Sequence, residues 1–331
     1  MKGGTYMCTC ITMKTRDIYF GRTMDIHYRF GEQVAVTPRN YRVPLKSGES
    51  FETWYAMIGM ASVRGGYPLY AEATNEKGLS MAGLNFPENA WYGEPVPGKR
   101  NLAPYEFMLW VLGTFATLED LKRELPSVWL VDIPIEPGTP TAPLHWMISD
   151  GAGSIVVEQT REEGFRVYDN PYGVLTNNPT FPYHSMNLNS FMNLTAEPPR
   201  NRFCKSLDLC AFGSGMGSIG LPGDNSPTSR FVRACFNRMN SLCGDSEEDS
   251  VSRFFHILDN VWLVRGSTML SGNVCNTTTY ACCVNTVRGI YYYKTYSNSQ
   301  LTAVRMTEKD ISSPSLTLYP LEEAQQVRYM N

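Results

Sequence analysis

The sequence lacks a long hydrophobic run. No apolar segment approaches the roughly 18 residues that a membrane-spanning helix needs, and no stretch of signal-peptide length precedes the polar residues 14–17. Charge of one sign is not in excess either: 29 Lys and Arg residues face 32 Asp and Glu residues, and the basic ones are scattered along the chain. A nucleic-acid-binding protein needs a basic patch or stripe. We therefore expect a cytoplasmic protein with neither a membrane nor a nucleic-acid partner.

Spacings typical of metal sites and disulfides are also missing. No histidine has a second histidine four residues away, so we expect no metal site; the histidines are His27, His145, His184 and His256. The nine cysteines are odd in number and form no C-x-x-C pair, which favours free thiols in a reducing compartment. The glycine-rich stretch 213–224 does not run straight into a helix, as a phosphate-binding loop must. A nucleotide site is therefore not expected.

The sequence does contain many short β-prone segments. Runs rich in Val, Ile, Thr and Tyr predict strands at 33–37, 154–159, 165–168, 277–284 and 290–295. Residues 8–25 predict a β-hairpin around a turn at 15–17, with Cys8 at the start of its first strand. Helix starts are indicated at Pro104, Thr117, Ser226 and Ser246. Because strands and helices interleave without a βαβ order, we expect a layered α+β domain.

The predicted hairpin carries a group of reactive residues. Arg22 and Asp25 lie three residues apart in its second strand, where a surface ion pair would be an ordinary explanation. If the second strand returns beside the first, however, both come close to Cys8. A guanidinium lowers the pKa of a nearby thiol, and a carboxylate stabilises the charged form of a nearby amine. Cys10 shares a strand face with Cys8, and we expect it to be a small buried side chain.

Two asparagines follow apolar runs at predicted turns, Asn85 and Asn177. Most asparagines in such places bond the turn backbone. An asparagine amide can instead donate to a developing oxyanion, which lowers the activation free energy of acyl transfer by roughly 3 kcal/mol per donor. From these stretches alone both explanations stay open.

Several long segments together resemble the choloylglycine hydrolase family, close to its conjugated bile acid hydrolases. They follow one another in the family's order: CTCITMKTRDIYFGRTMDI, YPLYAEATNEKGLSMAGLNFP, LHWMISD, VYDNPYGVLTNNP and SIGLPGDNSPTSRFVRACF. The likeness extends from Cys8 to about Val304. It implies an N-terminal nucleophile hydrolase fold, which is a four-layer αββα sandwich of two antiparallel sheets between helical layers. It also implies a single choloylglycine hydrolase domain over residues 8–331.

The resemblance implies a complete catalytic site. It makes Cys8 the nucleophile, and the residues expected around it are Arg22, Asp25, Asn85, Asn177 and Arg230. An apolar trough for a sterol is expected from Met24, Phe30, Ile133, Ile135 and Leu144. The alternative is that these five are ordinary core residues. Penicillin V acylases of the same scaffold usually carry Tyr in place of Asn85, which favours a bile salt, and Ala71 stands where some relatives carry an aromatic residue.

The activity that the resemblance implies is hydrolysis of the amide bond in glycine- or taurine-conjugated bile salts, and both conjugates stay open. A cysteine at a chain start has a thiol and an α-amine of pKa about 7.7 to 8.0, which can act as the base. No metal or organic cofactor is then expected.

Residues 1–7 are expected to be absent from the active enzyme, as a leader or because translation begins at Met7. The family implies a homotetramer. The alternatives are an acylase for penicillin V or acyl-homoserine lactones, and a non-catalytic bile-acid-binding protein.

Overall fold

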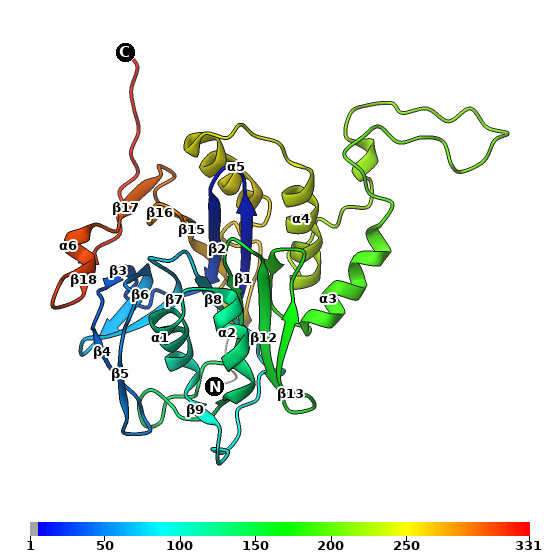
Figure 1. Cartoon of the computed structure of the whole chain (residues 1–331). Coiled ribbons are helices and arrows are strands. Elements are labelled where there is room, and N and C mark those ends of the chain that lie inside the picture. Colours follow the sequence, from blue (N-terminus) through cyan, green and yellow to red (C-terminus); the bar gives the residue numbers. More distant parts are fainter. Residues whose placement is uncertain (1–5) are drawn as a thin grey trace.

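Two antiparallel β-sheets packed face to face form the core of the molecule (Figure 1). The computed structural model describes residues 6–331. Over these residues, the first sheet has six strands in the order β14-β1-β2-β15-β16-β17. Its strands are β1 (Met7–Lys14), β2 (Ile18–Ile26), β14 (Val174–Leu175), β15 (Thr277–Asn285), β16 (Ile290–Thr295) and β17 (Thr302–Arg305).

The second sheet has eight strands within the described chain, in the order β13-β12-β11-β8-β7-β6-β3-β18. They are β3 (Gln33–Thr37), β6 (Met57–Arg64), β7 (Tyr67–Asn75), β8 (Ser80–Asn85), β11 (Leu144–Ser149), β12 (Ser154–Thr160), β13 (Gly164–Asp169) and β18 (Thr317–Tyr319). Two small ribbons lie outside the sheets: β4 (Arg42–Pro44) with β5 (Ser50–Glu52), and β9 (Arg100–Leu102) with β10 (Val128–Leu130).

Helices cover the outer faces of both sheets. On the second sheet, α1 (Pro104–Thr114) packs against β7 and β8, and α2 (Leu118–Glu124) follows it. On the first sheet, α4 (Pro227–Asn240) packs against β1, and α5 (Glu247–Asp259) packs against β2 and β15. The predicted αββα sandwich is confirmed. The remaining short helices are α3 (Phe181–Asn187), α6 (Glu308–Ile311) and the 3₁₀ turns Leu125–Ser127, Leu188–Phe191, Met216–Ser218 and Ser271–Asn273.

Local sequence signals account for most of the predicted elements. The hydroxyls of Thr117, Ser226 and Ser246 each accept a hydrogen bond from the backbone amide three residues further on, as helix caps do. Pro104 is the first residue of α1, and every predicted strand is present to within one residue at each end. The hairpin of β1 and β2 turns at 15–17, where the Thr15 amide donates to the Asp17 carbonyl. The predicted elements are therefore confirmed.

The main apolar cluster fills the space between the sheets and continues beneath α4 and α5. It includes Cys8 and Cys10, which are 2% and 0% exposed, so the expectation that Cys10 is buried is confirmed. A second cluster lies between the second sheet and the helices α1 and α2. The start of β1 is thus embedded in the apolar core of the fold.

The segment between α3 and α4 departs from this layered arrangement. Figure 1 shows it reaching far from the sheets, and we call residues 192–224 the arm. Its exposed apolar side chains are Met192, Phe203, Leu207, Leu209, Phe212 and Ile219. None of the described helices combines the length and the apolar character that crossing a bilayer requires.

Candidate active site

The β1–β2 hairpin brings the first three predicted site residues together. Its register pairs Cys8 with Met24, and pairs Met7 with Asp25. Arg22 and Asp25 are completely buried. The alternative that they form a surface ion pair at a hairpin end is therefore wrong, because neither side chain reaches the surface.

Two further predicted residues converge on Cys8 from distant parts of the chain. The backbone nitrogen of Cys8 donates to Oδ1 of Asn177 at 2.9 Å, and Arg230 Nη2 donates to the same oxygen at 2.8 Å. Arg230, from α4, also donates through Nη1 to the Cys8 carbonyl (2.6 Å) and to Thr9 Oγ1 (2.7 Å). Asn177 follows β14, which pairs with β1. The nitrogen that would become an α-amine in a chain starting at Cys8 thus points at an amide oxygen.

Asn85 approaches from the second sheet, at the end of β8. The groups around its amide favour the orientation in which Oδ1 accepts from the Tyr6 amide (3.1 Å) and Nδ2 donates to Pro143 O (3.2 Å). Asn177 Nδ2 donates to the Asn85 carbonyl at 2.8 Å, which joins the two asparagines. Tyr6, two residues before Cys8, therefore lies against Asn85.

Burial dominates the electrostatics of the thiol. It raises the pKa of Cys8, and the charge of Arg22 is the largest influence in the opposite direction. Burial also raises the pKa of Asp25 to about 6, opposed first by Arg230. Two hydroxyls donate to the Asp25 carboxylate, Thr278 at 2.6 Å and Thr23 at 3.1 Å. Asp25 is thus a buried carboxylate that titrates close to neutral pH.

Two histidines for which no role was expected hold the segment that carries Asn177. His184 Nε2 donates to the Asn177 carbonyl at 2.8 Å, and His145 Nε2 donates to the carbonyl of Thr176 at 3.0 Å. His145 Nδ1 lies 3.0 Å from Glu158 Oε1. Both rings are fully buried, and burial lowers the pKa of His184 to about 4. No spacing in the sequence pointed to this pair, because its members come from β11 and α3.

The five residues of the predicted apolar trough lie in different parts of the structure. Strand pairing places Met24 opposite Cys8, and places Leu144 opposite Asn85. Phe30 packs against the apolar cluster that contains Met24, whereas Leu144 packs against the other cluster; Ile133 and Ile135 are half-buried in the loop between β10 and β11. The part of these residues in a substrate trough stays a prediction.

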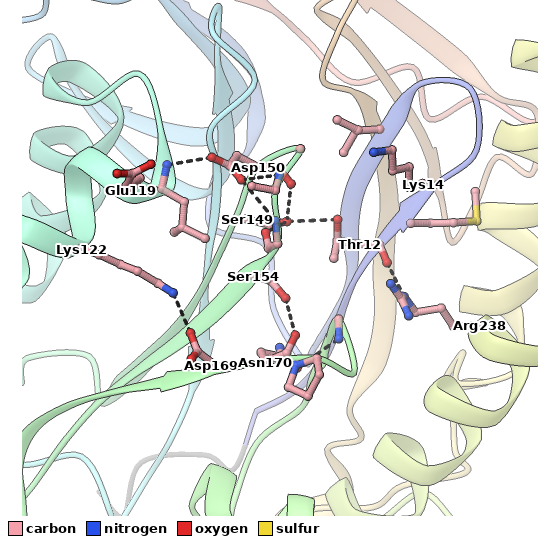
Figure 2. A pocket seen from close by; sticks show the side chains of 18 residues that line it. Thr12, Lys14, Glu119, Lys122, Ser149, Asp150, Ser154, Asp169, Asn170 and Arg238 are labelled. Carbon is pink, nitrogen blue, oxygen red and sulfur yellow. Dashed lines mark hydrogen bonds and ion pairs between the residues drawn. The ribbon is translucent and has the colours of Figure 1, made fainter.

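A cavity of about 640 Å³ lies at the other end of β1 (Figure 2). Its walls come from the β1–β2 turn, α2, the β11–β12 turn and α4, and include none of the predicted site residues. Its polar side chains largely bond one another: Lys122 Nζ lies 2.6 Å from Asp169 Oδ1, and Ser149 Oγ donates to Thr12 Oγ1 at 3.2 Å. We assign no ligand to it.

Comparison with known proteins agrees with this arrangement. Residues 8–319 match the linear amide C–N hydrolases, choloylglycine hydrolase family. The chain is 41% identical to a bile salt hydrolase/transferase of Lactiplantibacillus plantarum, over 98% of this chain and 100% of the relative. A relative of the same name from Clostridium perfringens is also 41% identical, with the same shares covered.

Solved structures give the same result. The conjugated bile acid hydrolase of Clostridium perfringens superimposes with a TM-score of 0.90 at 40% identity, over 98% of this chain and 100% of that one. A penicillin V acylase of Agrobacterium tumefaciens, at 20% identity and a TM-score of 0.71 over 97% of this chain and 99% of that one, shares the fold. The protein is thus an enzyme that hydrolyses linear C–N amide bonds. It belongs to the choloylglycine hydrolase family.

Proposed function

We propose that this protein hydrolyses the amide bond of glycine- or taurine-conjugated bile salts, with Cys8 as the nucleophile. The observation that carries the proposal is the 2.9 Å contact between the Cys8 nitrogen and Asn177 Oδ1, in a site where Arg230 and Asp25 are also buried. An amine at that position is oriented by an acceptor and lies on the same residue as the thiol. The names of the relatives from L. plantarum and C. perfringens support bile salts as the substrate.

The proposed reaction uses the two functional groups of Cys8. Its neutral α-amine takes the thiol proton, and the thiolate attacks the carbonyl carbon of the substrate amide. The amide N–H groups of Asn85 and Asn177 stabilise the oxyanion; Asn177 Nδ2 has one hydrogen left for this after its bond to the Asn85 carbonyl. The ammonium then protonates the departing glycine or taurine nitrogen as the C–N bond breaks. Water attacks the thioester carbonyl, the bile acid leaves, and the thiol is restored.

No other group is needed to complete this cycle. Cys8 supplies nucleophile, base and acid in turn, so we propose that the enzyme works without a metal or an organic cofactor. Arg22 stabilises the thiolate by its charge, and Asp25 stabilises the ammonium form of the amine. The small-molecule substrate lies against an apolar trough that includes Met24 and Leu144.

Residues 1–7 have no place in this mechanism. A peptide nitrogen has no basic lone pair, so Cys8 can act as its own base only when it is the first residue. The contact of the Tyr6 amide with Asn85 supports this proposal, since it places the segment before Cys8 against a residue of the proposed site. We favour translation from Met7 followed by removal of that methionine, with cleavage of a leader as the second route.

Substrate choice is tested by parallel assays on glycocholate, taurocholate and penicillin V. We expect release of glycine or taurine at a rate well above that of penicillin V hydrolysis. A strong preference for penicillin V or an acyl-homoserine lactone would reject bile salts as the substrate. Binding of the conjugates without release of the amino acid would instead favour a bile-acid-binding protein.

We also propose a cytoplasmic homotetramer. The arm supports assembly, because its exposed Phe203 and Phe212 are 83% and 91% accessible in the single chain and large exposed apolar side chains mark interaction surfaces. Light scattering of the purified protein is expected to give four times the chain mass. A monomer at micromolar concentration would reject the assembly.

A further inference from the structure

A buried carboxylate that the proposed reaction does not use lies behind the site. Glu72, in β7 of the second sheet, is completely buried and reaches across to the first sheet. Its Oε2 accepts from Tyr280 OH at 2.9 Å and lies 3.8 Å from Arg22 Nε. Its Oε1 accepts from Tyr291 OH at 2.6 Å and from the Cys282 thiol at 3.5 Å. Burial raises the pKa of Glu72, and the charge of Arg22 followed by these three hydrogen bonds acts in the opposite direction and favours the charged carboxylate.

Arg22 connects this carboxylate to the thiol. Its Nη1 donates to the carbonyls of Ala71 (3.2 Å) and Gly83 (2.6 Å), and its Nε donates to the carbonyl of Thr23 (3.2 Å). These backbone acceptors hold the guanidinium in place independently of Glu72. The charge of Arg22 is also the largest influence that lowers the pKa of Cys8. A change in the charge of Glu72 therefore alters the field at the thiol while Arg22 stays where it is.

We propose that Glu72 is a positioning residue for the reaction: as the buried counter-ion of Arg22, it limits the positive field that the guanidinium exerts on Cys8. This inference rests on the proposed role of Cys8 as the nucleophile. A thiol that is too acidic forms a weaker nucleophile, and the best attacking thiol has a pKa near the ambient pH. Burial raises the pKa of Cys8 and the charge of Arg22 lowers it, so a counter-ion of Arg22 sets how far the guanidinium offsets burial.

Other titrating groups near this pair do not replace Glu72. Asp25 and Arg230 also act on Cys8, but within residues 6–331 neither side chain bonds to Glu72. Cys10, on the same strand face as Cys8, has its pKa raised first by burial, with Arg22 opposing and Glu72 adding to the rise. Within the described chain, Glu72 is the carboxylate in ion-pair distance of Arg22.

The test replaces Glu72 by Gln in the chain that starts at Cys8, which removes the charge and keeps the shape. The rate at which iodoacetamide alkylates Cys8 is followed against pH by peptide mass spectrometry. The inflection of this rate against pH reports the pKa of the Cys8 thiol. We expect it to move down by about 0.5 to 1 pH unit in the variant, so that alkylation at pH 6 becomes about 3- to 10-fold faster. The KM for glycocholate is expected to stay unchanged while kcat follows the ionisation of the thiol, because Glu72 is completely buried and acts through Arg22.

Glu106→Gln is the matched control. Glu106 is also a buried carboxylate, but it accepts from the backbone amides of Lys46 and Ala103 at the start of α1, outside the inter-sheet layer. We expect this variant to lose stability and to keep the wild-type inflection. If both variants shift the inflection equally, the effect belongs to general loosening of the fold and the inference is wrong.

Tyr291→Phe keeps the inference falsifiable if Glu72→Gln does not fold. It removes one donor to Glu72 and preserves the ring, so the carboxylate is protonated more easily and the inflection should move in the same direction by a smaller amount. An inflection that stays in place or rises in a folded variant overturns the inference. Because alkylation needs no bile salt, a protein that shows the shift but does not hydrolyse glycocholate would reject the proposed substrate and leave the role of Glu72 supported.

Discussion

The backbone nitrogen of Cys8 lies 2.9 Å from Oδ1 of Asn177, a residue 169 positions further along the chain. Arg230 Nη2 donates to the same oxygen. This oxygen can therefore orient an α-amine at Cys8, and Arg230 keeps the amide turned toward it. We therefore expect two roles for Asn177. Its Oδ1 orients the amine, and its Nδ2, which also donates to the Asn85 carbonyl, donates to the oxyanion.

Replacement of Cys8 by Ser is expected to abolish turnover of glycocholate. A hydroxyl is almost wholly protonated near neutral pH, whereas a thiol beside Arg22 ionises far more easily. Cys10→Ser is the matched control, because Cys10 is equally buried on the same strand face. It should retain most of the activity and lose some stability. Activity like that of the wild type in Cys8→Ser would reject Cys8 as the nucleophile.

Asn177→Ala is expected to lower kcat by roughly 10²- to 10³-fold, the usual cost of losing an oxyanion donor. Loss of the acceptor for the Cys8 nitrogen adds to this effect. Steady-state kinetics on glycocholate separate kcat from KM. A change confined to KM would instead assign Asn177 to uniform substrate binding.

The chain that begins at Cys8 is expected to be the active form. Intact-mass measurement of active enzyme should give the mass of residues 8–331, and a preparation that retains residues 1–7 should be inactive. The reason is that the peptide nitrogen of Cys8 in that preparation lacks the basic lone pair of a free α-amine. Equal hydrolysis of glycocholate by both forms would show that some other group serves as the base.

Activity should fall on the acid side of about pH 6. Burial raises the pKa of Asp25 to about 6, so below that pH the carboxyl becomes neutral and no longer stabilises the charged amine. The profile of kcat/KM against pH should therefore have an acid limb near 6. Asp25→Asn is expected to be less active at neutral pH and to lack that limb. An unchanged limb in the variant would assign it to another group.

His184 is expected to make the protein sensitive to acid. Burial lowers its folded-state pKa to about 4, from 6.5 in an unfolded chain. Between these values only the unfolded chain binds the proton, so the free energy of unfolding falls as pH decreases from 6.5 to 4, by up to about 3 kcal/mol. Below pH 4 both states are protonated and this loss ends.

The measurement is the Tm of wild type and of His184→Gln at pH 7 and at pH 4. Glutamine can still donate to the Asn177 carbonyl but does not titrate, so the variant should lose less Tm between the two values. His256→Gln, on the exposed face of α5, is the control and should follow the wild type. Parallel losses in all three proteins would contradict the assignment to His184.

Local sequence patterns predicted much of the framework. The hairpin of residues 8–25, the strands rich in Val, Ile, Thr and Tyr, and the capped helices were all predictable, because their signals lie within a few residues of one another. Strands β7 and β8 were not predicted. They contain Pro68, Glu72, Ala82 and Gly83, which are poor β-formers, and they are held as strands by burial between helices and the opposite sheet.

The sequence by itself determined the candidate nucleophile and, through its family motifs, the residues expected beside it. Only the tertiary structure decided how those residues meet. No spacing in the sequence predicted the histidines that hold the Asn177 segment or the carboxylate that pairs with Arg22. Each of these contacts joins elements from different layers or distant parts of the chain. Burial then decides their charge: the same groups on a surface would titrate normally, and between two packed sheets their pKa values move with the partners that packing supplies.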